Sequence, residues 1–81
     1  MTEYTVIYEC GARNWSAYVP DLPGCIATGK TREQVEQRIR EAIECHIEGL
    51  RLRGDAVPKP TIEAGTVSVL AGLLTEPVPR P

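Results

Sequence analysis

Short runs of β-branched, aromatic and alternating residues occupy the first 30 positions, and they predict β-strands. Residues 5–8 (TVIY) have the β-branched and aromatic composition that is typical of a strand. Residues 15–19 (WSAYV) predict a second strand, and residues 25–29 (CIATG) predict a short third one. The links between them are short, at residues 11–14 (GARN) and 20–24 (PDLPG). Three strands with two tight links predict an antiparallel meander.

From Thr31 onward the hydrophobic period changes from two residues to three or four, which predicts a long amphipathic helix. Thr31 is a good N-cap, and Gln34 completes a capping box three residues later. Gly54 suits the position after the helix, and Pro58 prevents the helix from resuming. The apolar stripe consists of Val35, Ile39, Ala42, Ile43, His46, Ile47 and Leu50. This stripe must cover one face of the sheet.

Beyond the helix the spacing of hydrophobic residues is less regular. Residues 55–60 form a connector that contains proline, and residues 66–70 (TVSVL) alternate like a fourth strand. Residues 73–81 are rich in proline and predict a loose tail. The element order is therefore β-β-β-α-β, an α+β fold of two layers in one domain, residues 1–72, followed by the tail.

Composition and charge narrow the class of protein. The chain has 81 residues, of which 42% are hydrophobic and 25% charged, with a formal net charge of −2. A nucleic-acid-binding domain is usually basic, so this balance argues against that role. No run is apolar enough for a membrane span, and the N-terminus lacks the pattern of a secretory signal, so we expect a cytoplasmic protein. A chain this short has a thin core and often gains stability by self-association.

The residues that could carry chemistry are scattered. Cys10, Cys25, Cys45 and the single histidine, His46, could in principle bind zinc, but they lack the paired spacing of structural zinc sites, and we interpret them as packing residues. A nuclease would need carboxylates that converge on metal ions, and the candidates do not fall in one predicted cleft. Those candidates are Glu9, Asp21, Glu41, Glu44 and Glu48. We therefore expect neither catalytic nor metal or cofactor-binding residues.

Two surfaces could bind partners. The turn at residues 20–24 is either a rigid corner or a preformed contact that presents Asp21 and Leu22, since pre-organisation lowers the entropy lost on binding. Tyr18 lies on the opposite face from Trp15, which we assign to the core, so Tyr18 is the better candidate for an interface. The uncovered sheet face and the apolar fourth strand, with Val67, Val69 and Leu70, predict a homodimer or homotetramer.

The segment from Trp15 to Pro60 contains a compound motif. Its elements are the turn at residues 19–25 (VPDLPGC), Gly29, Thr31, Ala42, Ile43, His46, Gly49 and Leu50, in this order. With this motif the segment resembles the HicB antitoxin family. With the first strand near Tyr4 to Tyr8, the resemblance covers about three-quarters of the chain. It implies a partly degraded RNase H-like fold, which agrees with the predicted order of elements.

The resemblance also implies a role. Proteins of this family pair with HicA, a small basic toxin that cleaves mRNA, and block it by covering its active site. Many members carry a C-terminal DNA-binding segment, but the residues after Pro60 have no basic helical pattern, so direct DNA binding is not expected here. Two alternatives stay open: an oligomeric accessory or scaffold module without a toxin, and a residual metal-dependent nuclease.

Overall fold

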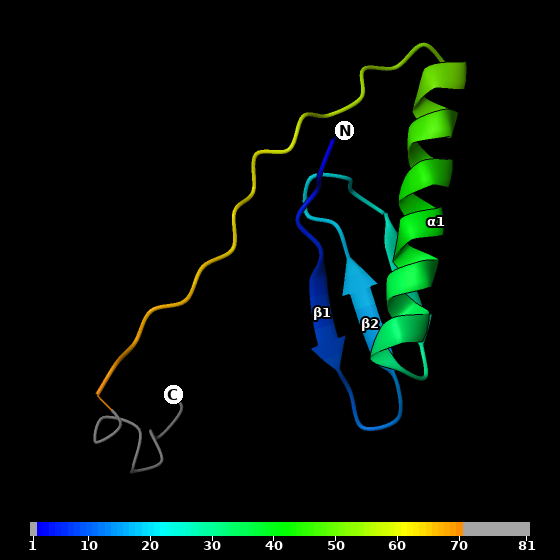
Figure 1. Ribbon diagram of the computed structural model, residues 1–81. Helices are drawn as coiled ribbons and strands as arrows, with labels where there is room; N and C mark the ends of the chain where they lie inside the picture. The colour runs from blue at the N-terminus through cyan, green and yellow to red at the C-terminus, as the bar shows by residue number, and fades with distance from the viewer. Residues whose placement is uncertain (1, 71–81) are drawn as a thin grey trace, which may run out of the picture.

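Three antiparallel strands and one helix make up the regular structure of the described residues (Figure 1). The computed structural model describes residues 2–70. The strands are β1 (Ile7–Cys10), β2 (Trp15–Tyr18) and β3 (Ile26–Gly29), and they form a sheet of order β1-β2-β3. The helix α1 (Arg32–Leu52) follows β3 after a two-residue link and lies across one face of the sheet. The predicted α+β meander and helix are thus confirmed.

The register of the sheet decides which side chains meet the helix. Tyr8 pairs with Ala17, which pairs with Ala27, and Cys10 pairs with Trp15, which pairs with Gly29. Paired residues project to the same side of a sheet. These two rows form the covered face, and α1 packs against it mainly over β3 and β2. The helix lies close to the sheet because the rows beneath it contain alanine and glycine.

Six hydrophobic residues form the buried core. They come from β2, from the link between β2 and β3, and from the first half of α1, and they are Ala17, Val19, Leu22, Cys25, Val35 and Ile39. Half-buried residues surround them, among them Trp15, which therefore packs against the core as expected. A core of this size agrees with the thin interior predicted from the length.

Both ends of α1 are capped by local hydrogen bonds. The Oγ1 atom of Thr31 accepts from the amide of Gln34 at 3.0 Å, as a capping box requires. The Oε1 atom of Gln34 reaches one residue further than in a standard box and accepts from the amide of Lys30 at 2.7 Å. At the other end Gly54 has a φ of 75°, and its amide and that of Asp55 donate to carbonyls of the last turn at 3.1 and 2.9 Å, a Schellman motif.

The second half of α1 has less sheet to cover. The helix has 21 residues, or about 31 Å at the usual rise, whereas a four-residue strand spans about 13 Å. Val35 and Ile39 are buried, but Ile43, His46 and Ile47 in the later turns are only half-buried. The predicted apolar stripe is therefore covered along its first half and partly open along its second.

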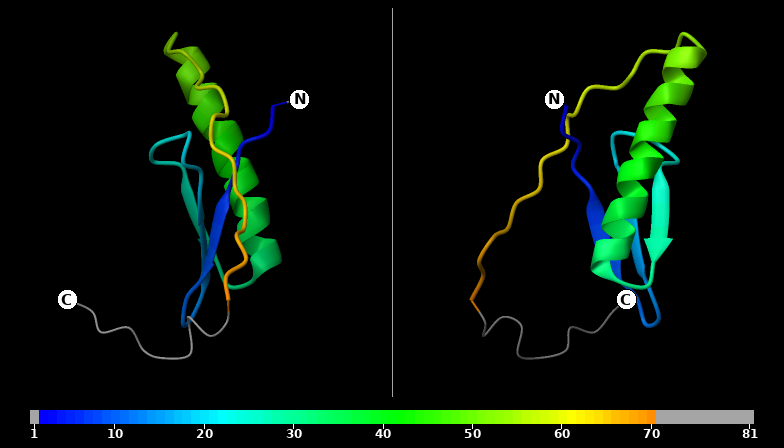
Figure 2. Two further views of the ribbon diagram at one scale, coloured as in Figure 1. Left: turned by 90° about the vertical axis from the view of Figure 1, so that its left-hand side faces the viewer. Right: turned by 45° about the vertical axis from the view of Figure 1, so that its right-hand side comes forward.

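Residues 53–70 contain neither helix nor strand. The predicted fourth strand at residues 66–70 is extended in direction but does not pair with the sheet, and its residues are exposed. The fourth strand therefore stays a prediction, since residues 63–70 run away from the sheet on the side of β1 (Figures 1 and 2). The predicted tail at residues 73–81 lies outside the described residues. Among the helices of residues 2–70, none is long and apolar enough to cross a membrane.

Candidate partner-binding site

The turn at residues 20–24 contributes a side chain to the hydrophobic core. The amide of Leu22 donates to the carbonyl of Val19, and the amide of Cys25 donates to the carbonyl of Leu22, each at 3.0 Å. These bonds fold the turn back on itself and bury Leu22 completely. Gly24 permits the reversal with a φ of 85°. Leu22 is thus a core residue, and the expectation that it is presented on the surface is wrong for this chain.

Asp21 also has an internal partner, which lies 40 positions away in the sequence. Its carboxylate accepts from the hydroxyl of Thr61 at 2.6 Å, from the amide of Thr61 at 3.0 Å and from the amide of Ile62 at 3.2 Å. These hydrogen bonds, first of all the one from the Thr61 hydroxyl, hold the pKa of Asp21 below its usual value. The side chain of Thr5 donates to the carbonyl of Ile62 at 2.7 Å. Asp21 and Thr5 together fix the chain at residues 61–62, and we call this contact the latch.

The face of the sheet opposite α1 is uncovered within residues 2–70, and we call it the open face. Ile7 pairs with Tyr18, and Tyr18 pairs with Ile26, so these three side chains form a row across all the strands. Tyr18 is 40% exposed and Ile26 is 64% exposed. Glu9, Ser16 and Thr28 form a second row beside the first. The open face therefore combines an apolar row with a polar row that carries one negative charge.

Sequence reasoning placed Tyr18 on this face but missed its two neighbours. The alternation that assigns Cys25 and Ala27 to the covered face also places Ile26 on the open one, so the signal for Ile26 was present in the sequence. Ile7 could be assigned only once its pairing with Tyr18 was known. A single strand shows which residues alternate, but it does not show which of its two sets faces the helix.

The cysteines, the histidine and the carboxylates do not gather into a reactive site. Among the described residues no three His, Cys, Asp or Glu side chains are placed to hold a metal ion together. Cys10 and Cys45 are exposed, whereas Cys25 is buried, and its burial raises the pKa of the thiol. His46 is half-buried on the apolar side of α1. Asp21, the acid that a residual nuclease would need, accepts hydrogen bonds from the latch instead.

Comparisons with known proteins agree with the resemblance to the HicB family. A model of HicB-like antitoxins of bacterial toxin–antitoxin systems matches residues 4–68. The UPF0150 protein ssr1765 of Synechocystis is 38% identical over 68 residues, which cover 83% of this chain and 86% of that protein. The UPF0150 protein Ta0767 of Thermoplasma acidophilum is 41% identical over 49 residues, 60% of this chain and 71% of the relative.

A third relative comes from a virus. A 14.9 kDa protein of the rep-hol intergenic region of Haemophilus phage HP1 is 42% identical over 56 residues, 69% of this chain but only 42% of the phage protein. The search of solved structures found no match. The family model spans both the sheet and the helix, together with the chain that leads through the latch. The protein therefore belongs to the family of HicB-like antitoxins of bacterial toxin–antitoxin systems.

Proposed function

We propose that this protein is a cytoplasmic antitoxin that binds a small basic mRNA-cleaving toxin of the HicA type and covers the toxin's active site. It acts by binding and performs no chemistry of its own. The family match supports the antitoxin role. The open face supplies the contact, and the exposed pair Tyr18 and Ile26 is the observation that carries this assignment.

Apolar exposure is the first reason to choose the open face. Large hydrophobic side chains grouped on one side of a small protein usually mark an interaction surface, and tyrosine is enriched among residues that dominate binding energy. Ile7, Tyr18 and Ile26 sit on three paired strands, so their backbone positions are fixed before binding. A pre-organised surface loses little entropy when a partner docks.

Charge is the second reason. The chain has a net charge of −2, and Glu9 is the charged residue among the described strand positions of the open face. A negative surface attracts a basic partner and raises the rate at which the two associate. We expect this attraction to weaken as salt rises, because exposed charges are screened.

The test is co-purification with a small basic protein of the HicA type, sought among the genes next to the one that encodes this chain. Tagged antitoxin should retain the toxin and relieve the growth arrest that the toxin causes. Ile26→Ser and Tyr18→Ala should weaken retention and restore toxicity. Leu52→Ser is the matched control, since Leu52 is an apolar residue that is 79% exposed at the end of α1, away from the open face. Retention that is lost equally in the control, or unchanged in all variants, would contradict this use of the open face.

The alternative is an oligomeric accessory module without a toxin. It is favoured by a separate observation, the exposed apolar residues Val67, Val69 and Leu70 near the end of the described chain. In that case no neighbouring protein would be retained, and the open-face variants would have no effect on growth. Self-association and toxin binding are compatible when they use different surfaces.

A further inference from the structure

Residues 63–70, which we call the arm, have the composition of a strand but no partner among the described residues. Val67 is 87% exposed, Val69 is 59% exposed and Leu70 is 76% exposed. Val67 and Val69 are two positions apart, so in an extended chain they project to one side, whereas Thr66, Ser68 and Leu70 project to the other. An extended segment with two valines on one side and two hydroxyl residues followed by Leu70 on the other is suited to the edge of a sheet that has a hydrophobic layer beneath the valine side.

The start of the arm is fixed in space. The latch holds residues 61–62 against Asp21 and Thr5, beside the beginning of β1. The hydroxyl of Tyr4 also donates to the carbonyl of Pro58, just before the latch. From this fixed point the arm runs on the β1 side of the molecule and diverges from the sheet (Figures 1 and 2). Its exposed side chains are thus held away from the sheet of their own chain.

The same chain carries a surface of matching shape. β1 is at the edge of the sheet, and within residues 2–70 no strand pairs with its outer side. Because α1 packs over β2 and β3, it leaves a groove of about 430 Å³ between itself and β1. The apolar walls of the groove are Tyr4, Val6 and Tyr8 on one side and Ile39, Ile43 and Ile47 on the other.

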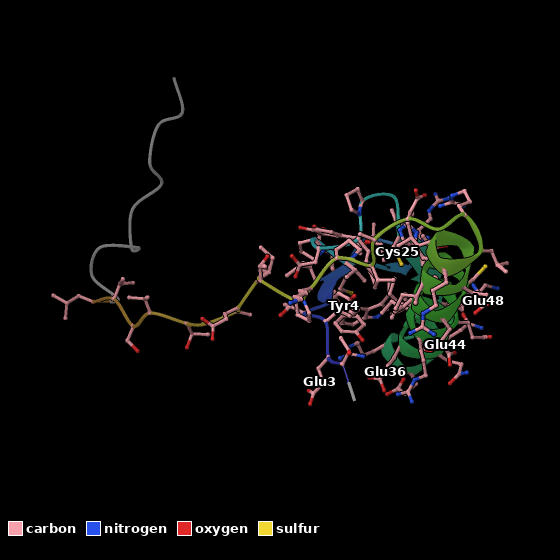
Figure 3. The ribbon with its side chains drawn as sticks, turned by 90° about the horizontal axis from the view of Figure 1, so that it is seen from above. Glu3, Tyr4, Cys25, Glu36, Glu44 and Glu48 are labelled. Atoms are coloured by element: carbon pink, nitrogen blue, oxygen red, sulfur yellow. The ribbon has the colours of Figure 1, made fainter. Side chains whose placement is uncertain are left out.

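The helix side of the groove carries a charged rim. Figure 3 shows Tyr4 between β1 and the helix, and Glu36 and Glu44 along the flank of α1, with the arm running far from all of them. Arg32 closes one end, where its guanidinium lies 3.4 Å from the centre of the Tyr8 ring and pairs with Glu36 at 2.8 Å. The groove is thus apolar inside, charged at the rim and bounded by an unpaired strand edge.

We propose that two copies of this protein exchange arms, each arm adding a fourth strand to the β1 edge of the other copy. The arm then pairs with the free backbone of β1, and Val67 and Val69 lie over the groove. Thr66 and Ser68 face the open side. The exchange is reciprocal, because both the arm and its acceptor belong to every copy, as a two-fold dimer requires.

The arrangement favours a second copy of this protein as the source of the strand that occupies the groove. The latch fixes the root of the arm while the arm itself diverges from its own β1, so the free end reaches outward. Within the described residues β1 and β3 are both edge strands, and the apolar groove adjoins the β1 edge. Exchange pairs this edge with an apolar arm that has no partner in its own chain. A domain with a six-residue core also gains from any additional apolar burial. The open face stays free in this dimer, so the exchange does not depend on the proposed toxin contact.

The test is the solution mass of the full chain by sedimentation. The unmodified protein should have the mass of two chains at micromolar concentration. The double variant Val67→Asp with Val69→Asp should have the mass of one, because two carboxylates would have to enter an apolar groove. The matched control is Thr66→Asp with Ser68→Asp, which adds the same charge to the side that faces away from the groove and should remain a dimer. Far-UV circular dichroism should show the same helix content in all three.

Amide hydrogen–deuterium exchange distinguishes a dimer with exchanged arms from a monomer in which the arm pairs with β1 of its own chain. Amides of residues 66–70 should be protected in the dimer and lose protection on dilution. A monomer with protected arm amides would show that the arm closes on its own β1, and a monomer with unprotected ones would show no pairing at all. A dimer that survives in the Val67 and Val69 variant would place the interface elsewhere. Each of these results overturns the proposal. Toxin retention measured on the same variants should be unchanged, so failure of the dimer and failure of the toxin contact are distinguishable.

Discussion

The two faces of the sheet differ most on β2 and β3, and in the opposite sense from a simple hydrophobic rule. The covered face has Ala17, Ala27 and Gly29 under the helix, with the larger Tyr8 and Trp15 in the same rows, whereas the open face displays Ile7, Tyr18 and Ile26. Ala17 is completely buried, and Ile26 is 64% exposed. Small residues are buried because they let the helix come close, and large ones remain outside where a partner can reach them. Side-chain size therefore reports the distance to the next layer as much as it reports hydrophobicity.

Sheet and helix lie close together at Gly29. A Cβ atom added there would lie 2.9 Å from the backbone nitrogen of Val35 and 3.2 Å from its Cα. Backbone atoms cannot move aside as a flexible side chain can, so glycine is required by contact rather than by its φ angle. Gly24 is the opposite case, because a Cβ atom there would meet nothing within 4 Å but φ is positive.

Truncating a core residue that packs on the covered face should have the largest effect on stability. Ile39→Ala deletes a buried side chain from the centre of a small core and should lower the free energy of unfolding by about 2–5 kcal/mol. Urea unfolding followed by circular dichroism measures it. For so small a domain this is a large share of the total stability. A loss below about 1 kcal/mol would indicate that the core has relaxed around the change.

Adding one carbon at Gly29, where sheet and helix lie close together, should have the next largest effect. Gly29→Ala places a methyl group against the backbone of Val35 and should cost about 1–3 kcal/mol, as overpacking does. Urea unfolding followed by circular dichroism measures this change as well. The control is Gly65→Ala, where a Cβ atom would meet nothing within 4 Å and φ is not positive, so stability should change little.

The helix cap should contribute less. Thr31→Ala removes the acceptor for the amide of Gln34 and should cost about 1 kcal/mol. Thr31→Ser keeps the hydroxyl and should restore most of the difference. If alanine and serine were equal in stability, the cap would not contribute through this hydrogen bond.

The latch should respond to pH without unfolding the domain. The pKa of Asp21 is lowered in the folded chain, so its contribution is complete above the ordinary value of 3.8 and is lost as the pH falls through the lowered value. We expect protection of the amides of Thr61 and Ile62 to decrease below that pH and the helix signal to persist. Asp21→Asn should show weak protection of these amides at every pH. Full protection in this variant would contradict the latch.

The smallest effect on stability should come from the open face. Ile26→Ser should change the free energy of unfolding by less than about 0.5 kcal/mol, because the side chain is already exposed. Its effect on toxin retention should be large by comparison. A variant that loses much stability would show that Ile26 contributes to folding, and the contrast between the two faces would then be smaller than the structure indicates.

Local signals in the sequence predicted most of the regular structure. Thr31 and Gly54 marked the ends of the helix within about two residues. The turns at residues 11–14 and 20–24 separated the strands correctly. Each of these features depends on residues that lie close together in the sequence, so its physical cause is visible there. Tyr18 was assigned to the open face for the same reason.

The features that could not be predicted depend on distant contacts. Leu22 stands among residues typical of an exposed turn, and only its three-dimensional neighbours show that it is buried. The hydrogen bonds between Asp21 and Thr61 join positions 40 apart in the sequence, and no local sequence pattern predicts them. Residues 66–70 have the alternation of a strand, but alternation does not say whether a partner edge is within reach.

The order of the strands also has a consequence for how the chain folds. Each strand pairs with its neighbour in sequence, and the helix follows β3 after only Lys30 and Thr31. Proteins whose contacts are mostly local fold faster than those with distant pairings. All pairings of the sheet and helix lie within residues 7–52, whereas the latch joins positions 40 apart. We therefore expect the open face to form early in folding and the root of the arm to dock afterwards.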